Sequence, residues 1–144
     1  MNNAVRWHLF LPCAAGVEAL LCEEIGRLLP GTPLQTQRGG GSLESDTEGL
    51  MALNLGSRLA QRVLIEVAGA DYRHEDDLYA LARRVDWAAW ITPQHTLRVD
   101  TTAQRSPLKS LNFAALRTKD AVCDQLREQT GERPDVDTRA PDLQ

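Results

Sequence analysis

The apolar residues of this chain follow two different periods in succession. Residues 5–11 alternate between apolar and polar side chains, which is typical of a half-buried β-strand. The apolar residues that come next recur at helical spacing, and they are Val17, Leu20, Leu21, Ile25, Leu28 and Leu29. They form one stripe on a predicted helix over residues 16–29, which Pro30 and Gly31 end.

A three-glycine run at residues 39–41 separates two short predicted strands, residues 33–38 and 42–45. A glycine loop that holds phosphate follows a strand and opens a helix, because the helix-terminal N–H groups then face the phosphate. Here the glycines lie between two strands. The sequence therefore predicts a hairpin turn and no phosphate site.

A second helix is predicted over residues 48–56. Asp46 or Thr47 is its expected N-cap, because a short side-chain oxygen accepts from the free N–H groups of the first turn. The β-branched residues Val63, Ile65 and Val67 then favour a strand. The resulting order, β-α-β-β-α-β, predicts an α+β fold, with a ferredoxin-like domain over residues 1–68 and helices on one face of an antiparallel sheet.

A different order of elements begins at residue 69. Apolar side chains at helical spacing predict a helix through residues 78–85, with Asp76 and Asp77 in its first turn, where the helix dipole favours acids. Residues 95–102 then alternate as a strand.

The last predicted helix covers residues 112–130, and Gly131 ends it. Pro134, Pro141 and a dense run of charged residues follow, with no further hydrophobic run. About one convincing strand is too little to close a sheet over these helices. We therefore expect residues 69–144 to be an α/β domain that is cut short.

The composition is that of a soluble globular protein, with 42% hydrophobic and 25% charged residues among 144. No apolar run approaches the roughly 20 residues that span a bilayer. Trp7, His8 and Pro12 interrupt the apolar N-terminal segment, so a signal peptide is not expected. The three cysteines lack C-x-x-C spacing, which argues against disulfides and zinc and favours a cytoplasmic location.

The formal net charge of -4 argues against a nucleic-acid-binding protein, but it hides a local excess of cations. Between residues 98 and 119 the cations are Arg98, Arg105, Lys109, Arg117 and Lys119. Asp100 is the one acid of this stretch, so its charge is +5 - 1 = +4. A basic stripe on an acidic protein is compatible with RNA binding.

Sequence motifs for catalysis are missing. His8, His74 and His95 are scattered, without a carboxylate or cysteine at metal-ligand spacing. The chain contains no G-x-S-x-G, no H-E-x-x-H and no dinucleotide-binding fingerprint. We expect neither catalytic residues nor a metal site, and this chain alone is not expected to be an enzyme.

The cations of the last helix allow two interpretations. An apolar seam is predicted from Leu116, Cys123 and Leu126. Lys119 falls on this seam, so it either buries its stem and keeps its ammonium in water, or lines, with Lys109 and Arg117, a groove that faces phosphate oxygens. Arg117 is expected to be exposed beside the seam.

The cations of the C-terminal tail are open to the same two interpretations. Arg133 and Arg139 either pair with Asp135 and Asp137 or extend the basic surface.

Several stretches carry family-specific motifs: LPCAAGVEALLCEEI, RGGGSLESD, LNLGSRLAQRVL, RRVDW, and residues 106–143 with K-D-A, R-P-x-V-D and P-D-L. Together they cover nearly the whole chain. They resemble the N-terminal region of the bacterial 23S ribosomal RNA guanine-N2 methyltransferases. The GGGS of this chain departs from the family, in which a more apolar strand start follows the hairpin.

The resemblance implies a ferredoxin-like domain followed by a THUMP domain, an RNA-binding module, over residues 69–144. In the family an S-adenosylmethionine-dependent methyltransferase domain follows, often with a second one for N7 methylation. Its glycine-rich cofactor loop and asparagine-proline motif are absent from this chain, so no cofactor is expected to bind here. The implied partners are ribosomal RNA and the C-terminal methyltransferase domains, and no membrane.

The residues expected to contact RNA are the cations and one amide of the last helix and its flanks: Arg105, Lys109, Asn112, Arg117, Lys119 and Arg133. Two alternatives stay open. The chain could be a free-standing RNA-binding module, or a ferredoxin-like domain that binds a small molecule.

Overall fold

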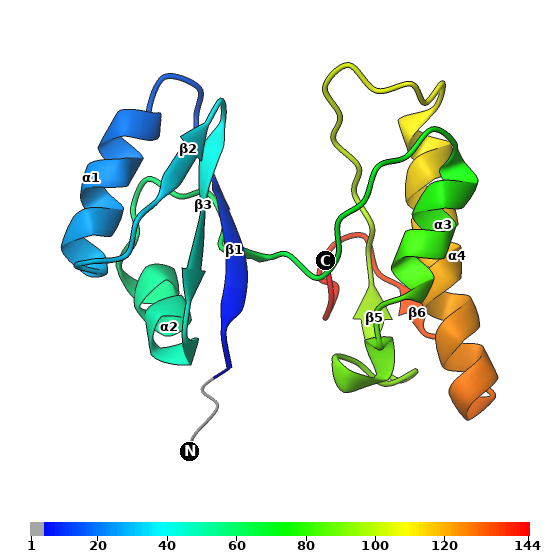
Figure 1. Cartoon of the computed structure of the whole chain (residues 1–144). Helices are drawn as coiled ribbons and strands as arrows, with labels where there is room; N and C mark the ends of the chain where they lie inside the picture. Colours follow the sequence, from blue (N-terminus) through cyan, green and yellow to red (C-terminus); the bar gives the residue numbers. More distant parts are fainter. Residues whose placement is uncertain (1–4) are drawn as a thin grey trace. The chain divides into compact units, whose positions relative to one another are not determined.

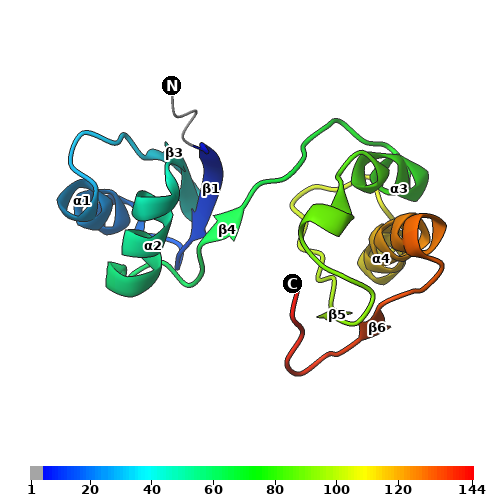
Figure 2. The same cartoon turned by 90° about the horizontal axis from the view of Figure 1, so that it is seen from below.

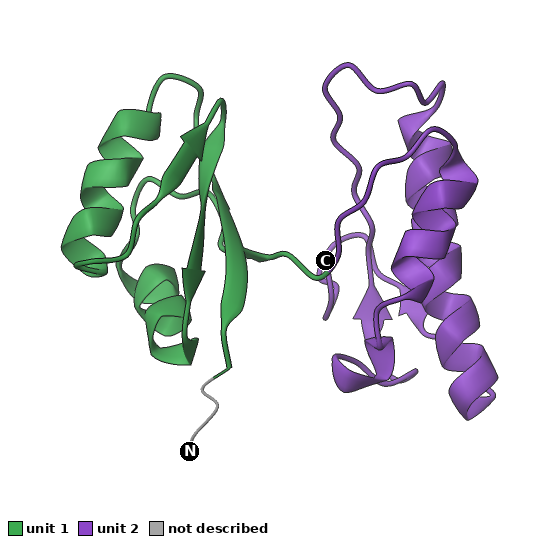
Figure 3. Ribbon diagram, viewed as in Figure 1, with its two compact units in different colours: residues 1–67 green, residues 68–144 purple. Residues whose placement is uncertain are grey.

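The structure is a computed structural model that describes residues 5–144. The chain divides into two compact units, residues 1–67 and residues 68–144 (Figure 3). Each unit has its own cluster of buried apolar residues. No helix among the described residues is long and apolar enough to cross a membrane.

The first unit contains one antiparallel sheet of four strands (Figure 1). The strands are β1 (Trp7–Pro12), β2 (Gln35–Gln37), β3 (Gly40–Ser45) and β4 (Leu64–Ile65), in the order β2-β3-β1-β4. Helices α1 (Glu18–Leu28) and α2 (Thr47–Gly56) lie on one face of this sheet (Figure 2). The predicted α+β, ferredoxin-like order of elements is confirmed.

The core of the first unit lies between the sheet and its two helices. The buried residues are Leu9 and Leu11 of β1, Leu43 of β3, Leu21 and Ile25 of α1, and Leu53 of α2. In β1, Leu9 and Leu11 therefore face the core, as the alternation of apolar and polar residues predicted. Full burial of one such side chain stabilises the fold by about 1.5–3 kcal/mol.

The hairpin between β2 and β3 forms as predicted, but its turn is shorter than the glycine run. Arg38 and Gly39 make the turn, with Gly39 at φ 87°, and Gln37 pairs with Gly40. Gly40 and Gly41 belong to β3. A Cβ on Gly40 would lie 2.7 Å from Phe10 Cζ, so these two glycines are needed for close packing and not for turning.

The second unit is built around two packed helices, α3 (Glu75–Arg83) and α4 (Leu111–Thr130). A 3-10 helix, η1 (Trp87–Ala89), and the parallel strands β5 (Thr96–Leu97) and β6 (Asp135–Val136) complete it. Its buried cluster contains Ile91, Leu97, Val122, Cys123 and Leu126. Gly131 ends α4 in the left-handed conformation at φ 84°, as predicted.

Two predictions about strands in this unit are wrong. The strand expected over residues 95–102 is limited to Thr96–Leu97. The tail expected to contain no strand supplies two partners for it, because Leu97 pairs in parallel with Val136 of β6 and forms a bridge with Leu143. The pairing uses backbone groups, which a charged, proline-rich tail also has.

The predicted apolar seam of α4 is also partly wrong. Cys123 and Leu126 are buried, but Leu116, which lies two turns before Cys123 on the same side of the helix, is 50% exposed. The other buried residues of α4 are Ala114, Ala121, Val122 and Gln125. The buried apolar cluster of the unit takes its α4 members, Val122, Cys123 and Leu126, from the second half of the helix, where Gln125 also donates to the Arg83 and Val85 carbonyls at 2.9 and 2.7 Å.

Candidate functional site

Arg117 lies in the seam between α3 and α4. Its guanidinium is 2.9 Å from the Asp76 carboxylate and stacks over the Tyr79 ring, with Cζ 4.3 Å from the ring centroid. Its side chain is 27% exposed, so the predicted free position beside an apolar seam is wrong. The stacking on an aromatic face and the ion pair together fix the orientation of this cation.

Tyr79 is itself held in this seam. Its hydroxyl donates to Asp124 at 2.7 Å, and this hydrogen bond, with burial, raises the pKa of Tyr79. Arg83 and Glu128 form a two-bond ion pair beside it, at 3.1 and 2.6 Å. The surface of the α3–α4 seam is therefore a network of paired charges.

Lys119 and Arg133 share one carboxylate. Lys119 Nζ is 3.3 Å from Asp120, and an Arg133 nitrogen is 3.9 Å from the same oxygen. The neighbouring side chain of the buried Cys123 raises the pKa of Arg133. Of the two interpretations of Arg133, the ion pair with Asp135 does not occur among the described residues, because Arg133 contacts Asp120 in the middle of α4.

The tail that follows is fixed mainly by backbone hydrogen bonds. Asp137 accepts from the N–H groups of Arg139 and Ala140 at 2.8 and 3.1 Å, so it closes a turn instead of binding the Arg139 guanidinium. Arg98 donates to the Thr138 carbonyl at 2.8 Å and pairs with Asp100 at 2.8 Å. Of the predicted basic stripe, Arg98, Arg117 and Lys119 thus have carboxylate partners.

The remaining two cations of the stripe have no such carboxylate partner among the described residues. Arg105 and Lys109 are exposed, and within residues 5–144 neither takes part in an ion pair. They lie in the segment before α4, and Asn112 is exposed in the first turn of that helix. Arg105 has a positive φ of 51°, which is unusual for a residue with a side chain.

Hydrogen bonds hold this segment against the rest of the unit. The Tyr72 hydroxyl donates to the Ser106 hydroxyl at 2.9 Å, and Ser106 also accepts from the Leu108 N–H at 3.2 Å. Ser110 caps α4 by accepting from the Phe113 N–H at 3.2 Å. The two unpaired cations are therefore placed beside the start of α4.

The first turns of the two helices contrast in charge. Glu75, Asp76 and Asp77 occupy the first turn of α3, where the Arg73 and His74 N–H groups lower the pKa of Asp77. No acidic residue stands in the first turn of α4. The N-terminal end of α4, which is the positive end of the helix dipole, thus has no acid in its first turn and is preceded by Arg105 and Lys109.

Three apolar side chains near the start of α4 are exposed, which the sequence did not predict. Leu111, Phe113 and Leu116 are 38%, 49% and 50% exposed. The missed signal is the spacing: Phe113 and Leu116 are three residues apart, so they lie close together on the surface of the first half of the helix. The residues of α4 that belong to the buried apolar cluster, Val122, Cys123 and Leu126, lie in its second half.

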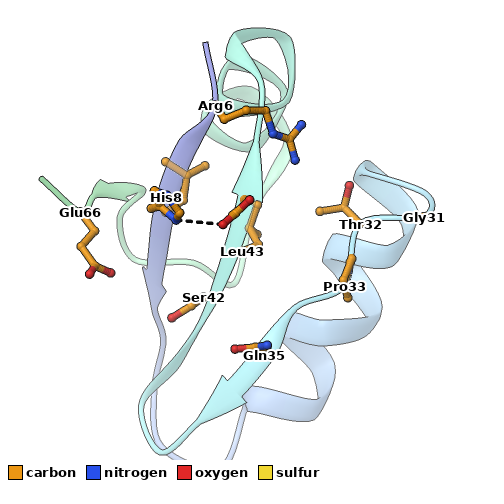
Figure 4. A pocket seen from close by; sticks show the side chains of 11 residues that line it. Arg6, His8, Gly31, Thr32, Pro33, Gln35, Ser42, Leu43 and Glu66 are labelled. Carbon is orange, nitrogen blue, oxygen red and sulfur yellow. Dashed lines mark ion pairs between the residues drawn. The ribbon is translucent and has the colours of Figure 1, made fainter. Parts of the chain in front are cut away.

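The first unit contains a pocket of about 410 Å³ between β1, β3 and the segment before β2 (Figure 4). Its charged lining residues are Arg6, His8, Glu44 and Glu66, and His8 Nδ1 lies 3.1 Å from Glu44. None of the six residues expected to contact RNA lines it. No group of three or more potential metal ligands occurs among the described residues.

Both units match known protein families. Residues 8–64 match the RlmL ferredoxin-like domain, and residues 72–144 match the THUMP domain. The chain is 39% identical over 134 residues to a ribosomal RNA large subunit methyltransferase K/L of Syntrophotalea carbinolica, and 40% identical over 139 residues to that of Pseudomonas entomophila. These alignments cover 93% and 96% of this chain but only 19% of each relative.

Solved structures show the same fold. A predicted N6-adenine-specific DNA methylase of Listeria monocytogenes superposes with a TM-score of 0.80 at 23% identity, over 91% of this chain and 35% of that protein. A possible methylase of Clostridium difficile gives 0.80 at 25% identity, over 89% and 34%. The chain belongs to the THUMP domain family, and it corresponds to the N-terminal ferredoxin-like and THUMP region of the large-subunit ribosomal RNA methyltransferases.

Proposed function

We propose that this chain is the RNA-binding region of a large-subunit ribosomal RNA guanine-N2 methyltransferase. The observation that carries the proposal is the THUMP match over residues 72–144, on a unit in which two exposed cations without an ion pair among the described residues, Arg105 and Lys109, lie just before α4. Because the chain spans 19% of the relatives, methyl transfer with S-adenosylmethionine is assigned to a separate domain of the longer protein. The role of this region is to hold ribosomal RNA for that domain.

The proposed RNA contacts begin at the start of α4. Arg105, Lys109 and Asn112 are exposed, and within the described residues the two cations have no carboxylate to release before they bind a phosphate. Cations that neutralise phosphates displace condensed counterions, which favours binding. Residues 69–144 are proposed to act as the domain that carries this surface.

The other proposed contacts are paired in the free chain. Arg117 has Asp76, and Lys119 and Arg133 share Asp120. These ion pairs are partly exposed, and such pairs contribute only about 0–1 kcal/mol. Phosphate oxygens can therefore replace the carboxylates at low cost, so these three residues are proposed as secondary contacts.

The test is RNA binding measured at low and high salt, by electrophoretic shift with structured ribosomal RNA fragments. Binding should weaken steeply with salt, and replacing both Arg105 and Lys109 by Ala should reduce the log–log slope by about 0.7–0.9 for each phosphate that is no longer neutralised. Glu23→Gln is the control, because Glu23 is exposed on α1, and it should leave the slope unchanged. Binding without salt dependence would contradict the proposal and favour a small-molecule site in the first unit.

A further inference from the structure

An exposed aromatic residue follows the two unpaired cations, Arg105 and Lys109, closely in the sequence. Phe113 is 49% exposed in the first turn of α4, four residues after Lys109 and eight after Arg105. A large apolar ring at the surface costs solvation unless a partner covers it. Lys109 and Arg105 are exposed as well.

The backbone of Phe113 is held in place by hydrogen bonds. The backbone N–H of Phe113 donates to the Ser110 hydroxyl at 3.2 Å, and the Tyr72–Ser106 hydrogen bond holds the segment that precedes α4. An aromatic side chain on a helix loses little further freedom when a flat partner stacks on it. Phe113 is therefore a platform that is already positioned.

The charge around the ring indicates what kind of partner covers it. Arg105 and Lys109, which precede the ring in the sequence, have no ion pair among the described residues, whereas Arg117 and Lys119 pair with Asp76 and Asp120. Apolar protein interfaces are depleted of charge at their centre. A partner with a flat apolar face and negative charge on both sides fits better, and an unpaired nucleotide has this combination.

We propose that Phe113 stacks on an unpaired base of RNA, while Lys109 and Arg105 hold the adjacent phosphates. The inference rests on the proposed function and adds to it the class of RNA, a single-stranded segment next to structured RNA. In a duplex both faces of a base are covered by its neighbours, so a duplex cannot use the ring.

The test compares Phe113→Ala with the unchanged chain. Affinity is measured for a short unpaired oligonucleotide and for a fully paired two-stranded duplex of equal charge, each over a series of salt concentrations. Removal of the stacking ring should weaken binding of the unpaired RNA by about 5- to 150-fold. The salt slope should not change, since the cations that neutralise phosphates are all still present, and binding of the duplex should not change. Phe113→Tyr should restore the affinity.

Two further variants make the result specific. Leu116→Ala removes a neighbouring side chain of equal exposure (50%) that cannot stack, and it should have little effect. Lys109→Ala should lower the salt slope by about 0.7 on unpaired RNA. Circular dichroism checks that each variant keeps its helices.

The possible contrary results are distinct. Unchanged affinity of Phe113→Ala for unpaired RNA, with a lower slope for Lys109→Ala, would overturn the stacking and leave the proposed function intact. Absence of salt-dependent binding by the unchanged chain would overturn both. Self-association in sedimentation that both Phe113→Ala and Leu116→Ala abolish would show that the ring lies in a protein interface, which would also overturn the inference.

Discussion

Glu24 shows how one charged residue is stabilised inside the first unit. It is buried on the core side of α1, where its carboxylate accepts from the Ser57 hydroxyl at 2.5 Å and from the N–H groups of Arg58 and Leu59 at 3.0 and 3.3 Å. Burial alone would raise the pKa of this carboxyl, but the hydrogen bonds outweigh it and the pKa is lowered. Glu24 thereby connects α1 to residues 57–59, which follow α2.

We expect Glu24→Ala to destabilise the chain strongly. The change leaves the Ser57 hydroxyl and two N–H groups without their acceptor, and each buried group left unsatisfied costs about 1–3 kcal/mol. The free energy of unfolding in urea measures the loss. The neighbouring Glu23 is exposed on the same helix. Glu23→Ala is the matched control, and an equal loss in both variants would contradict this role.

The same carboxylates predict acid sensitivity of the first unit. The pKa of Glu18 is also lowered, chiefly because it accepts from the Gly39 N–H at 2.8 Å, which ties α1 to the hairpin turn. A folded-state pKa below the ordinary value of 4.5 gives stability that is complete above that value and is lost as the pH falls through the folded-state pKa. Thermal unfolding followed below pH 4.5 should show this loss. It should be smaller in Glu24→Gln, which has no charge to lose at that position.

At the scale of elements, β5 is short but central to the second unit. Leu97 is 1% exposed, contacts the core beside Val122 and Leu126, and pairs with Val136 on one side and Leu143 on the other. The Arg98 N–H also donates to the Leu143 carbonyl at 2.9 Å. The two residues of β5 thus hold the C-terminal tail at two places, Val136 and Leu143.

Leu97→Ala should therefore destabilise the second unit by about 2–5 kcal/mol, the usual cost of truncating a buried leucine. Urea unfolding followed by circular dichroism provides the measurement. Leu55 of α2 is 90% exposed, so Leu55→Ala should change stability by less than about 0.5 kcal/mol. A destabilisation by Leu97→Ala no larger than that by Leu55→Ala would show that the tail is not packed against β5.

At the scale of the whole molecule, two units of nearly equal length have unequal sheets. The first unit has four antiparallel strands, and β1 pairs with β3 over six residues. The second has two strands of two residues each. Short strands with unpaired edges open more easily than a strand bonded on both sides.

Hydrogen exchange should reveal this difference. Amides of β1 and β3 should exchange more slowly than those of β5 and β6, because opening the longer sheet breaks more backbone hydrogen bonds at once. Equal protection of the strands in both units would contradict the expectation. A dimer that pairs free strand edges would also equalise protection, so the mass in solution is measured in parallel.

A second prediction at this scale concerns the cofactor. Residues 1–144 should bind no S-adenosylmethionine, because the chain has no glycine-rich loop that joins a strand to a helix. Isothermal titration calorimetry gives the answer. Stoichiometric binding would contradict the assignment of the cofactor to another domain, and a paired titration with RNA would show that the sample is active.

The sequence by itself determined the order of elements and the family. Alternation in residues 5–11 and the helical stripe of α1 are local patterns, and Asp46 accepts from the Gly49 N–H at 2.8 Å as one of the two predicted caps. Periods, caps and glycine stops depend on neighbouring residues, so they can be predicted without the fold. Motif resemblance identified the family in the same way.

Only the tertiary structure decided which side chains are covered and which charges are paired. The helix period places Leu116 on the same side of α4 as the buried Cys123, but the tertiary structure covers Cys123 and leaves Leu116 50% exposed. The charge count marked a basic stripe, yet Asp76 of a different helix reaches Arg117, while Arg105 and Lys109 stay unpaired among the described residues. The tail became strand because Leu97 offers backbone partners on both sides. These outcomes depend on residues distant in the chain, and a local pattern carries no information about them.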